Sequence, residues 1–542
     1  MSKGPELLVV IPAFKEQSVF QDDLVKKLAG HSLVERAINK ALSLDATIRE
    51  IILFTDSEDI SLIGKRNRVS SVFLTSGMQN LAHALRSRLN ESSNIRKKAI
   101  SVLMLSPYAP LITKDELMSA LNKFISSNVD VLRPVRHEKH QLFRETPQAI
   151  DEFLSESQDH ELILNSQAFS FFHYDFVVRE VSHPAKMAPW VLSQDMVEIE
   201  TLQDWWVLEK LLQRKRIVFR VIGNNEVGMG HIYRALSIAH ELTDHEILFV
   251  CDSESYEVVD QLAGYDYWLD VVPAGEMIDL ISKLNPDLVI NDMLDTTAAY
   301  VKALKTTGSA VVNFEDLGSG AALSDLTINE LYDEPTIEGS QILWGHNYFF
   351  VREEFDQARQ HKFSGKVHNI LLTFGGTDQH NLTRAIYRAV WELCGNFGVH
   401  IHIVTGLGYQ GYKALAKEVK KNGGASLTHA TGVMSQIMEQ TEIAITSNGR
   451  TVYELAHMKI PSIVIPQNER ECTHSFANEG TGFIAVSPYQ KGVSEDQVYR
   501  SLKKLLTQSN YRLNLMKNME PYSFRENKQK VLSEILQLVK AV

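Results

Sequence analysis

Short apolar runs alternate with helical patterns along almost the whole chain, and this alternation restricts the possible folds more than any other feature. The runs are rich in Val, Ile and Leu without polar alternation, as expected of strands buried on both faces. They form three successive series, over residues 6–107, 216–316 and 369–466. Strands that alternate with helices in this way predict an α/β fold built on parallel sheets.

Polar stretches between the series mark the expected domain boundaries. The basic stretch "LLQRKR" separates the first two series, and "EEFDQARQHKFSGK", which lacks a strand pattern, separates the second from the third. A chain of 542 residues is also too long for one ordinary core. We therefore expect three α/β domains, at 1–213, 214–360 and 361–542.

Bulk properties exclude several classes of partner. The formal net charge of −12 argues against nucleic acid and against an anionic membrane surface. No apolar run reaches the roughly 18 residues of a membrane-spanning helix. The three cysteines are far apart and odd in number, which gives neither a disulfide framework nor a zinc-ligand spacing. We expect a cytoplasmic protein without a membrane span; the oligomeric state stays open, a homo-oligomer included.

A glycine-rich turn with a histidine follows the first strand of the second series. In "RVIGNNEVGMGHIYRALSIAHEL", Gly228 and Gly230 precede His231, and apolar residues at three-to-four spacing predict a helix from there. Glycines let the backbone approach a ligand closely, and a helix N-terminus carries partial positive charge. That charge favours a neutral imidazole, which can accept a proton from water or a hydroxyl. A structural turn with a solvated histidine is the competing interpretation.

Two further turns follow strands of the third series. Gly375 and Gly376 come directly after "LLTF", and Asn448, Gly449 and Thr451 come directly before a helix. Thr451 is a candidate cap for that helix, whose free N–H groups suit a diphosphate. Glu454 lies one turn further, where its carboxylate could accept hydrogen bonds from ribose hydroxyls. Structural turns and a first-turn dipole residue are the alternatives.

Five motifs of the C-terminal part occur in the order of a known family: "GMGHIYRALSIAHEL", "VVNFEDLG", "WGHNYFFVREEF", "LLTFGGTDQHNLT" and "SNGRTVYELAHMKIPSIVIP". On these motifs, residues 216–542 resemble the UDP-sugar hydrolases of pseudaminic acid biosynthesis and the related spore-coat polysaccharide proteins. The resemblance implies the glycosyltransferase-B (GT-B) architecture of two facing Rossmann-like domains. It also implies metal-free cleavage of a UDP-sugar, with His231 assisting the attacking water and Gly449, Thr451 and Glu454 in the nucleotide-binding turn.

The chain departs from this family where the sugar would bind. Ile222, Met293 and the pair Arg470–Glu471 stand where the family has aspartate, tyrosine and Asn–Gln. Asn291 and Asp292, at the end of the strand in "VINDML", are expected to contact the sugar, and His474 is a further candidate. A surface position is the alternative for His474.

The N-terminal part carries a second set of motifs, "VVIPA", "KLAGHSLVERAI", "ILFTDSEDI", "LMLSPYAPLIT", "ILNSQAFSFF" and "VEIETLQDWWVLEKLL". In this order they resemble the CMP-sialic acid synthetase-type cytidylyltransferases. The resemblance implies a Rossmann-like nucleotidyltransferase domain with CTP and an acidic sugar as substrates. It also implies a Mg²⁺ cofactor, with Glu198 and Glu200 where the family has two metal-binding aspartates.

The loop that grips the triphosphate in such enzymes is altered. Phe14, Asp22 and Asp23 occupy positions where the family has arginine and lysine, and Lys15, Lys26 and Lys27 are possible substitutes. Two acidic groups there would repel a triphosphate by about a kcal/mol or more each. An active transferase and a degenerate or ligand-sensing domain both remain open.

The sequence thus predicts a nucleotide-sugar enzyme of nonulosonic acid or surface glycan biosynthesis. The C-terminal half is expected to hydrolyse a UDP-linked amino sugar without a cofactor, with a cytidylyltransferase-like domain fused before it. Alternatives are a glycosyltransferase that uses the UDP-sugar, an active acylneuraminate cytidylyltransferase with a non-catalytic C-terminal half, and a nucleotide-sugar sensor.

Overall fold

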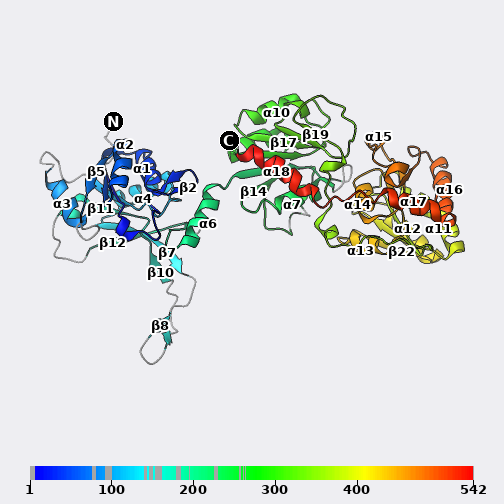
Figure 1. Ribbon diagram of the computed structural model, residues 1–542, viewed down its shortest axis with the longest axis horizontal. Coiled ribbons are helices and arrows are strands. Elements are labelled where there is room, and N and C mark those ends of the chain that lie inside the picture. Colours follow the sequence, from blue (N-terminus) through cyan, green and yellow to red (C-terminus); the bar gives the residue numbers. More distant parts are fainter. Residues whose placement is uncertain are drawn as a thin grey trace. The chain divides into compact units, whose positions relative to one another are not determined.

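The computed structural model divides the chain into two compact units, Met1–Arg214 and Lys215–Val542. Figure 1 colours the chain along its sequence, so that the blue-to-cyan N-terminal unit and the green-to-red C-terminal unit can be followed. None of the described helices is long and apolar enough to cross a membrane. The structure describes residues 6–75, 81–91, 100–138, 143–145, 150–152, 162–178, 185–193, 196–224, 230–255, 258–259, 262, 264–376 and 378–540.

A mixed eight-stranded sheet forms the centre of the N-terminal unit, in the order β10-β7-β11-β6-β1-β4-β5, with β12 paired to β7. Its parallel part joins β1, β4, β5 and β6, and β11 is antiparallel to both of its neighbours. The strands are β1 (Glu6–Pro12), β4 (Thr47–Thr55), β5 (Ser70–Phe73), β6 (Ile100–Leu105), β7 (Val131–Glu138), β10 (Leu162–Asn165), β11 (Phe169–His173) and β12 (Met187–Val191). Two ribbons, β2 (Lys27–Leu28) with β3 (His31–Ser32) and β8 (Phe143–Glu145) with β9 (Ile150–Glu152), are separate from it.

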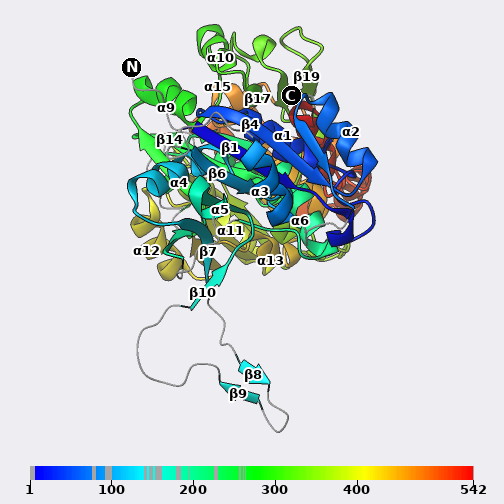
Figure 2. The same cartoon turned by 90° about the vertical axis from the view of Figure 1, so that its left-hand side faces the viewer.

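Helices cover both faces of this sheet. They are α1 (Leu33–Leu42), α2 (Glu58–Arg66), α3 (Leu81–Glu91), α4 (Lys114–Ser126), α5 (Tyr174–Val178) and α6 (Leu202–Leu212). The start of α1 is fixed by a capping box between Ser32 and Glu35. Figure 2, in which this unit faces the viewer, shows α3 and α5 side by side, away from α2.

The first sheet of the C-terminal unit has seven parallel strands in the order β15-β14-β13-β16-β17-β18-β19. They are β13 (Arg216–Val221), β14 (Glu246–Asp252), β15 (Trp268–Val272), β16 (Leu288–Asp292), β17 (Ala310–Phe314), β18 (Leu326–Asn329) and β19 (Ile342–Trp344). The main helices of this half are α7 (Gly230–Ala239), α9 (Met277–Leu284) and α10 (Ala298–Lys305). Because the strand order reverses beside β13, a ligand crevice is expected beyond the carboxyl ends of β13 and β16.

The second sheet repeats this arrangement with six parallel strands in the order β22-β21-β20-β23-β24-β25. They are β20 (Asn369–Thr373), β21 (His400–Thr405), β22 (Ala425–His429), β23 (Ile443–Ser447), β24 (Ser462–Ile465) and β25 (Phe483–Ala485). Its helices are α11 (Leu382–Phe397), α12 (Tyr412–Asn422), α13 (Met434–Glu439), α14 (Thr451–Met458), α15 (Glu469–Cys472), α16 (Val493–Thr507) and α17 (Ser509–Asn518). Two doubly wound sheets in one unit confirm the predicted GT-B-like class.

The last helix, α18 (Asn527–Lys540), packs on the first sheet and not on the second, which precedes it in the chain. In Figure 1 it is the red helix among the green elements of the first sheet. Its apolar residues Val531, Ile535 and Val539 are buried in the first sheet's core, because they complete the layer over its strands. This corrects the expectation that 361–542 forms one domain.

The chain therefore passes between the two sheets twice, before β20 and before α18. The two passages contact each other, since Asn527 Nδ2 donates hydrogen bonds to the carbonyls of His346 (3.1 Å) and Phe349 (2.7 Å). The aromatic rings of Phe349, Tyr453 and Phe524 pack together beside them and join the two halves in one apolar cluster.

Candidate active site

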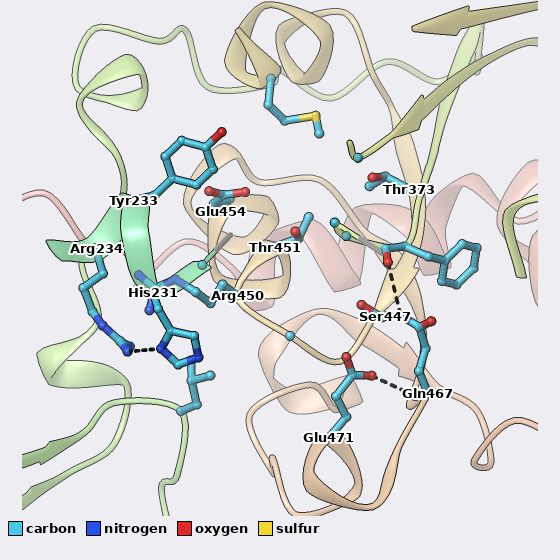
Figure 3. Close-up of a pocket in the computed structure, with 18 of the residues that line it drawn as sticks. His231, Tyr233, Arg234, Thr373, Ser447, Arg450, Thr451, Glu454, Gln467 and Glu471 are labelled. Atoms are coloured by element: carbon cyan, nitrogen blue, oxygen red, sulfur yellow. Dashed lines mark hydrogen bonds between the residues drawn. The ribbon is translucent and has the colours of Figure 1, made fainter. Parts of the chain in front are cut away.

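A cavity of about 860 Å³ lies between the two sheets of the C-terminal unit, at the carboxyl ends of their strands. It is lined from the first half by the start of α7 and from the second half by the turns after β20, β21 and β23 and by α15. Its volume lies within the usual range of small-molecule sites, about 300–1,000 Å³. Figure 3 shows how the two halves present side chains to it.

His231 lines this cavity from the first turn of α7 and is held from behind by a buried carboxylate. Its Nδ1 lies 2.5 Å from Oδ1 of Asp292, at the end of β16. Arg234 donates to both oxygens of that carboxylate, with 2.7 Å from Nε to Oδ2. Because a bare nitrogen lone pair would repel a carboxylate oxygen at 2.5 Å, we place the proton on Nδ1. Nε2 is then the ring nitrogen that can accept a proton.

Asp292 differs from its expected role as a sugar-binding residue. Its exposed fraction is 0%, and His231 and Arg234 occupy both of its oxygens. Burial acts to raise the pKa of this carboxyl, but Arg234 and His231 outweigh it and hold the pKa below its usual range. Asp292 is therefore placed to orient the imidazole rather than to reach a sugar.

Arg234 is the centre of a buried ionic cluster that the sequence did not reveal. It is fully buried, and its Nη1 donates to Glu315 (2.6 Å) and to Glu330 (2.8 Å) as well as holding Asp292. Arg450 also donates to Glu330, from the second half. Three carboxylates thus face two guanidinium groups in a region with little water.

Glu315, which follows β17, lines the cavity with an unusual backbone. Its φ of +51° lies in the left-handed region that residues with side chains rarely adopt. Burial acts to raise the pKa of its carboxyl, whereas Arg234, His231 and Arg450 hold it well below its ordinary value. The strain is kept because the cluster fixes the carboxylate, and strained residues of this kind gather at functional sites.

The turn between β23 and α14 presents an anion-binding backbone. Thr451 is the first residue of α14, and the N-cap is Arg450, whose side chain makes no cap hydrogen bond. The expectation that Thr451 caps the helix is therefore wrong, because the helix begins one residue earlier than that role requires. The backbone N–H groups of Gly449, Arg450 and Thr451 have no acceptor among the described residues. Such a helix start, eight residues long, favours a phosphate.

Glu454 lies one turn into α14, where Figure 3 shows it beside Tyr233. Arg352 donates from Nε to one of its oxygens at 2.9 Å, and the guanidinium of Arg352 lies 5.5 Å from the centre of the Tyr233 ring. Glu454 is 7% exposed and lines the cavity, so the pairing fixes its carboxylate at the wall.

The other predicted residues divide between the cavity and its surroundings. The cavity is lined by Gly230, Gly375, Gly376, Gly449, Thr451, Glu454 and His474. Asn448 lies just behind the turn and donates to the carbonyls of Glu471 and His474, at 2.8 Å each. Asn291 does not line the cavity: it donates to Asn313 and accepts from Tyr300, at 2.8 Å each. Gly228 lies outside the described residues.

Residues that sequence reasoning missed are Arg234, Glu315, Glu330, Arg352 and Arg450. Two of them had a usable signal. Arg234 is a charged residue three positions after His231, on the same face of an otherwise apolar helix. Glu315 directly follows a buried strand, where ligand-binding residues of such sheets are found.

The expected magnesium ligands of the N-terminal unit, Glu198 and Glu200, have different surroundings. Glu198 is buried and accepts hydrogen bonds from Ser166 Oγ and from the N–H of Gln167 (3.0 Å). Glu200 is exposed, and its nearest cation is Arg136 at 3.6 Å. Among the described residues, no three His, Cys, Asp or Glu side chains are grouped so that they could hold a metal ion. Because Mg²⁺ is often held by only one or two carboxylates together with substrate phosphates, the role of Glu198 and Glu200 as its ligands stays a prediction.

Carboxylates of the loop after β1 and of the residue after β4 occupy this loop. Asp56 accepts from the N–H groups of Lys15 (2.7 Å) and Glu16 (3.1 Å), and Lys15 Nζ lies 3.5 Å from Asp22. Asp23 is fully buried and accepts from the N–H of Val19 at 2.7 Å. The ammonium of Lys15 and the N–H groups of Lys15 and Glu16 are therefore already paired with internal anions.

We expect this unit not to bind CTP with Mg²⁺, because Asp22 and Asp56 would repel a triphosphate and compete with it for the Lys15 ammonium and the loop N–H groups. Isothermal titration of the full chain with CTP and MgCl₂ should give no saturable heat at CTP concentrations up to about 1 mM. Any binding free energy would then be weaker than about −4 kcal/mol. Titration of the same sample with UDP checks the C-terminal unit, and a thermal unfolding transition of the N-terminal unit is the control that this unit is folded. Saturable micromolar CTP binding would contradict this expectation.

The C-terminal part of the chain is similar in sequence to known proteins. Residues 370–535 match the family described as the glycosyltransferase family 28 C-terminal domain. The spore coat polysaccharide biosynthesis protein SpsG of Bacillus subtilis is 25% identical over 274 residues, 48% of this chain and 80% of that protein. The UDP-2,4-diacetamido-2,4,6-trideoxy-β-L-altropyranose hydrolase of Campylobacter jejuni is 26% identical over 178 residues, 32% of this chain and 64% of the hydrolase.

An uncharacterized protein of Methanocaldococcus jannaschii is 26% identical over 274 residues, and the chain spans little more than half of it, 56%. Among solved structures, MurG of Acinetobacter baumannii has a TM-score of 0.44 at 14% identity, covering 60% of this chain and 99% of its own. CMP:2-keto-3-deoxy-manno-octonic acid synthetase has a TM-score of 0.32 at 9% identity, covering 38% of this chain and 98% of its own. The resemblance recognised in the C-terminal part of the sequence is represented among the curated relatives.

Proposed function

We propose that the C-terminal unit hydrolyses a UDP-linked amino sugar to UDP and the free sugar, in the biosynthesis of a nonulosonic acid or another surface glycan. The observation that carries the proposal is that His231, backed by the buried Asp292, lines the same cavity as Gly449 and Thr451, whose N–H groups have no acceptor among the described residues. One side supplies a base for water, and the other supplies donors for a departing diphosphate. The relatives that act on nucleotide sugars and spore coat polysaccharide support the same class of substrate.

In the proposed reaction, Nε2 of His231 takes a proton from a water molecule, whose oxygen attacks the anomeric carbon. The bond between that carbon and the diphosphate oxygen breaks, and UDP leaves with the electron pair. Donors at the turn before α14 stabilise the charge that develops on this oxygen. Asp292 stabilises the imidazolium that forms, as a buried carboxylate does in related catalytic pairs.

Two polar residues are assigned to recognition. Glu454, held by Arg352, orients the ribose through its carboxylate. His474 donates from Nδ1 to the carbonyl of Asn448 at 2.7 Å, which leaves Nε2 as a buried acceptor without a partner among the described residues. Burial lowers the pKa of His474, so the ring stays neutral and can accept a hydrogen bond from a hydroxyl or an acetamido N–H of the sugar.

A panel of UDP-sugars, each given alone to the full chain, tests the proposal. We expect one UDP-amino sugar to yield UDP and free sugar in equal amounts without an added acceptor, with the products measured by mass spectrometry. In water enriched in ¹⁸O, the label should appear in the sugar and not in UDP, because the bond to the anomeric carbon breaks. UDP release that requires an acceptor would show a glycosyltransferase, and tight binding without turnover would show a sensor.

A further inference from the structure

The side chain of Arg450 leaves the nucleotide-binding turn and crosses to the first half of the unit. A Cβ on Gly230 would lie only 3.1 Å from Cδ of Arg450, closer than such contacts normally come. The guanidinium lies 4.7 Å from the centre of the Phe349 ring and donates to the carboxylate of Glu330. The glycine before the catalytic histidine therefore provides room for an arginine that comes from the opposite half.

Glu330 receives this arginine in the interior. It follows β18, its exposed fraction is 0%, and its Oε1 accepts from both Arg450 and Arg234. Its other oxygen is buried and has no partner among the described residues. Two arginines of opposite halves thus share one carboxylate oxygen, so a movement of either guanidinium changes the pairing of the other.

Arg234 carries the connection to the histidine. The same guanidinium that contacts Glu330 and Glu315 also holds both oxygens of Asp292, whose Oδ1 accepts from His231. Figure 3 shows Arg450 between His231 and the start of α14. The result is an unbroken series of charged contacts from the residue between Gly449 and Thr451 to the imidazole.

We propose that Arg450 is a positioning residue for His231: through Glu330, Arg234 and Asp292 it ties the orientation of the imidazole to the place of the nucleotide-binding turn. The inference rests on the proposed function for its catalytic part. Its physical basis is that the backbone of Arg450 faces the diphosphate site while its side chain faces the buried cluster. A diphosphate that fixes the position of the turn then also fixes the positions of the charged side chains behind His231.

The main test replaces Arg450 by alanine in the full chain. UDP affinity, measured by isothermal titration, should stay within about threefold, because the backbone N–H groups are unchanged. The turnover number should fall by about 5- to 150-fold, the range of typical coupling between sites. The matched control is Arg388→Ala, which removes an exposed arginine that pairs with Glu418 outside the cavity. A loss of UDP affinity equal to the loss in turnover would overturn the proposal, because it would mean that the guanidinium binds the nucleotide directly.

A second measurement does not depend on hydrolysis. In protein with ¹³C-labelled histidine, UDP should shift the titration midpoint of the His231 resonance in the wild type, and the shift should disappear in Arg450→Ala. The groups that face this imidazole are Asp292, Arg234 and Glu315, with Glu330 and Arg450 behind them. If the wild type binds UDP and shows the shift but hydrolyses no sugar, the proposed function fails while the coupling stands. An equal shift in both proteins would overturn the coupling.

The double variant Arg450→Ala with Glu330→Gln separates positioning from a loss of folding. It removes the buried carboxylate that the single variant leaves short of a partner, so it should restore thermal stability. Turnover should stay low in the double variant, because the connection from the turn remains broken. Recovery of turnover together with stability would show that Arg450 only stabilises the fold, and would overturn the proposal.

Discussion

Replacing His231 by glutamine should abolish UDP release and leave UDP binding almost unchanged. Glutamine keeps a polar side chain of similar length but cannot take a proton from water. General base catalysis of this kind contributes about 10²- to 10⁴-fold, so the turnover number should fall by that factor. The measurement is single-turnover UDP release with the best UDP-sugar, alongside isothermal titration with UDP.

Two further variants make this result specific. Asp292→Asn should lower turnover strongly with the fold intact, because an amide can hold the ring in the wrong tautomer. His361→Gln removes a histidine that does not line the cavity and should leave turnover unchanged. If His231→Gln released UDP at the wild-type rate, the assignment of the base would be wrong.

Replacing Arg234 by methionine should destabilise the C-terminal unit more than any other single change in the site. Asp292, Glu315 and Glu330 would lose the guanidinium that they share, and removing one partner of a buried ion pair typically costs about 3–5 kcal/mol. The free energy of unfolding from urea titration, followed by a probe in the C-terminal unit, checks this. The control Arg388→Ala removes an exposed pair and should cost less than about 1 kcal/mol.

The pH dependence of stability gives an independent check on the same cluster. The pKa values of Asp292 and Glu315 are held below their usual range in the folded protein, so the stability that they contribute is present at neutral pH. It is lost as the pH falls below about 4, the pKa of an unperturbed carboxyl. In Arg234→Met these pKa values rise, so acidification should cost the variant less than the wild type. Equal acid sensitivity would contradict the cluster's role.

Local sequence signals are sufficient to predict the sheets and the turns at their edges. The buried strands, the histidine at the start of α7 and the glycine turn before α14 all follow from patterns within about 20 residues, and fold class and cavity follow from them. The turn before α14 was placed correctly, although the capping role given to Thr451 was not.

Pairing between distant segments had no such signal. Arg450 and Glu330 are 120 positions apart in the chain, and Asp292 and Arg234 are 58 apart, so only the fold brings them together. For this reason Asp292 was predicted to contact a sugar although it serves as the partner of His231. The packing of α18 on the first sheet has no local signal either. Its apolar stripe could cover either sheet, and only tertiary packing decides which sheet it covers.

The two adjacent passages of the chain between the sheets have a mechanical consequence. A single linker would let the halves swivel freely, whereas two linkers bonded through Asn527 to the carbonyls of His346 and Phe349 define an axis. Any relative rotation of the halves is therefore expected to occur about that axis, beside the packed rings of Phe349, Tyr453 and Phe524. A rotation of this kind would change the width of the cavity mouth. At each closure it would bring His231 and the diphosphate donors back to the same relative position.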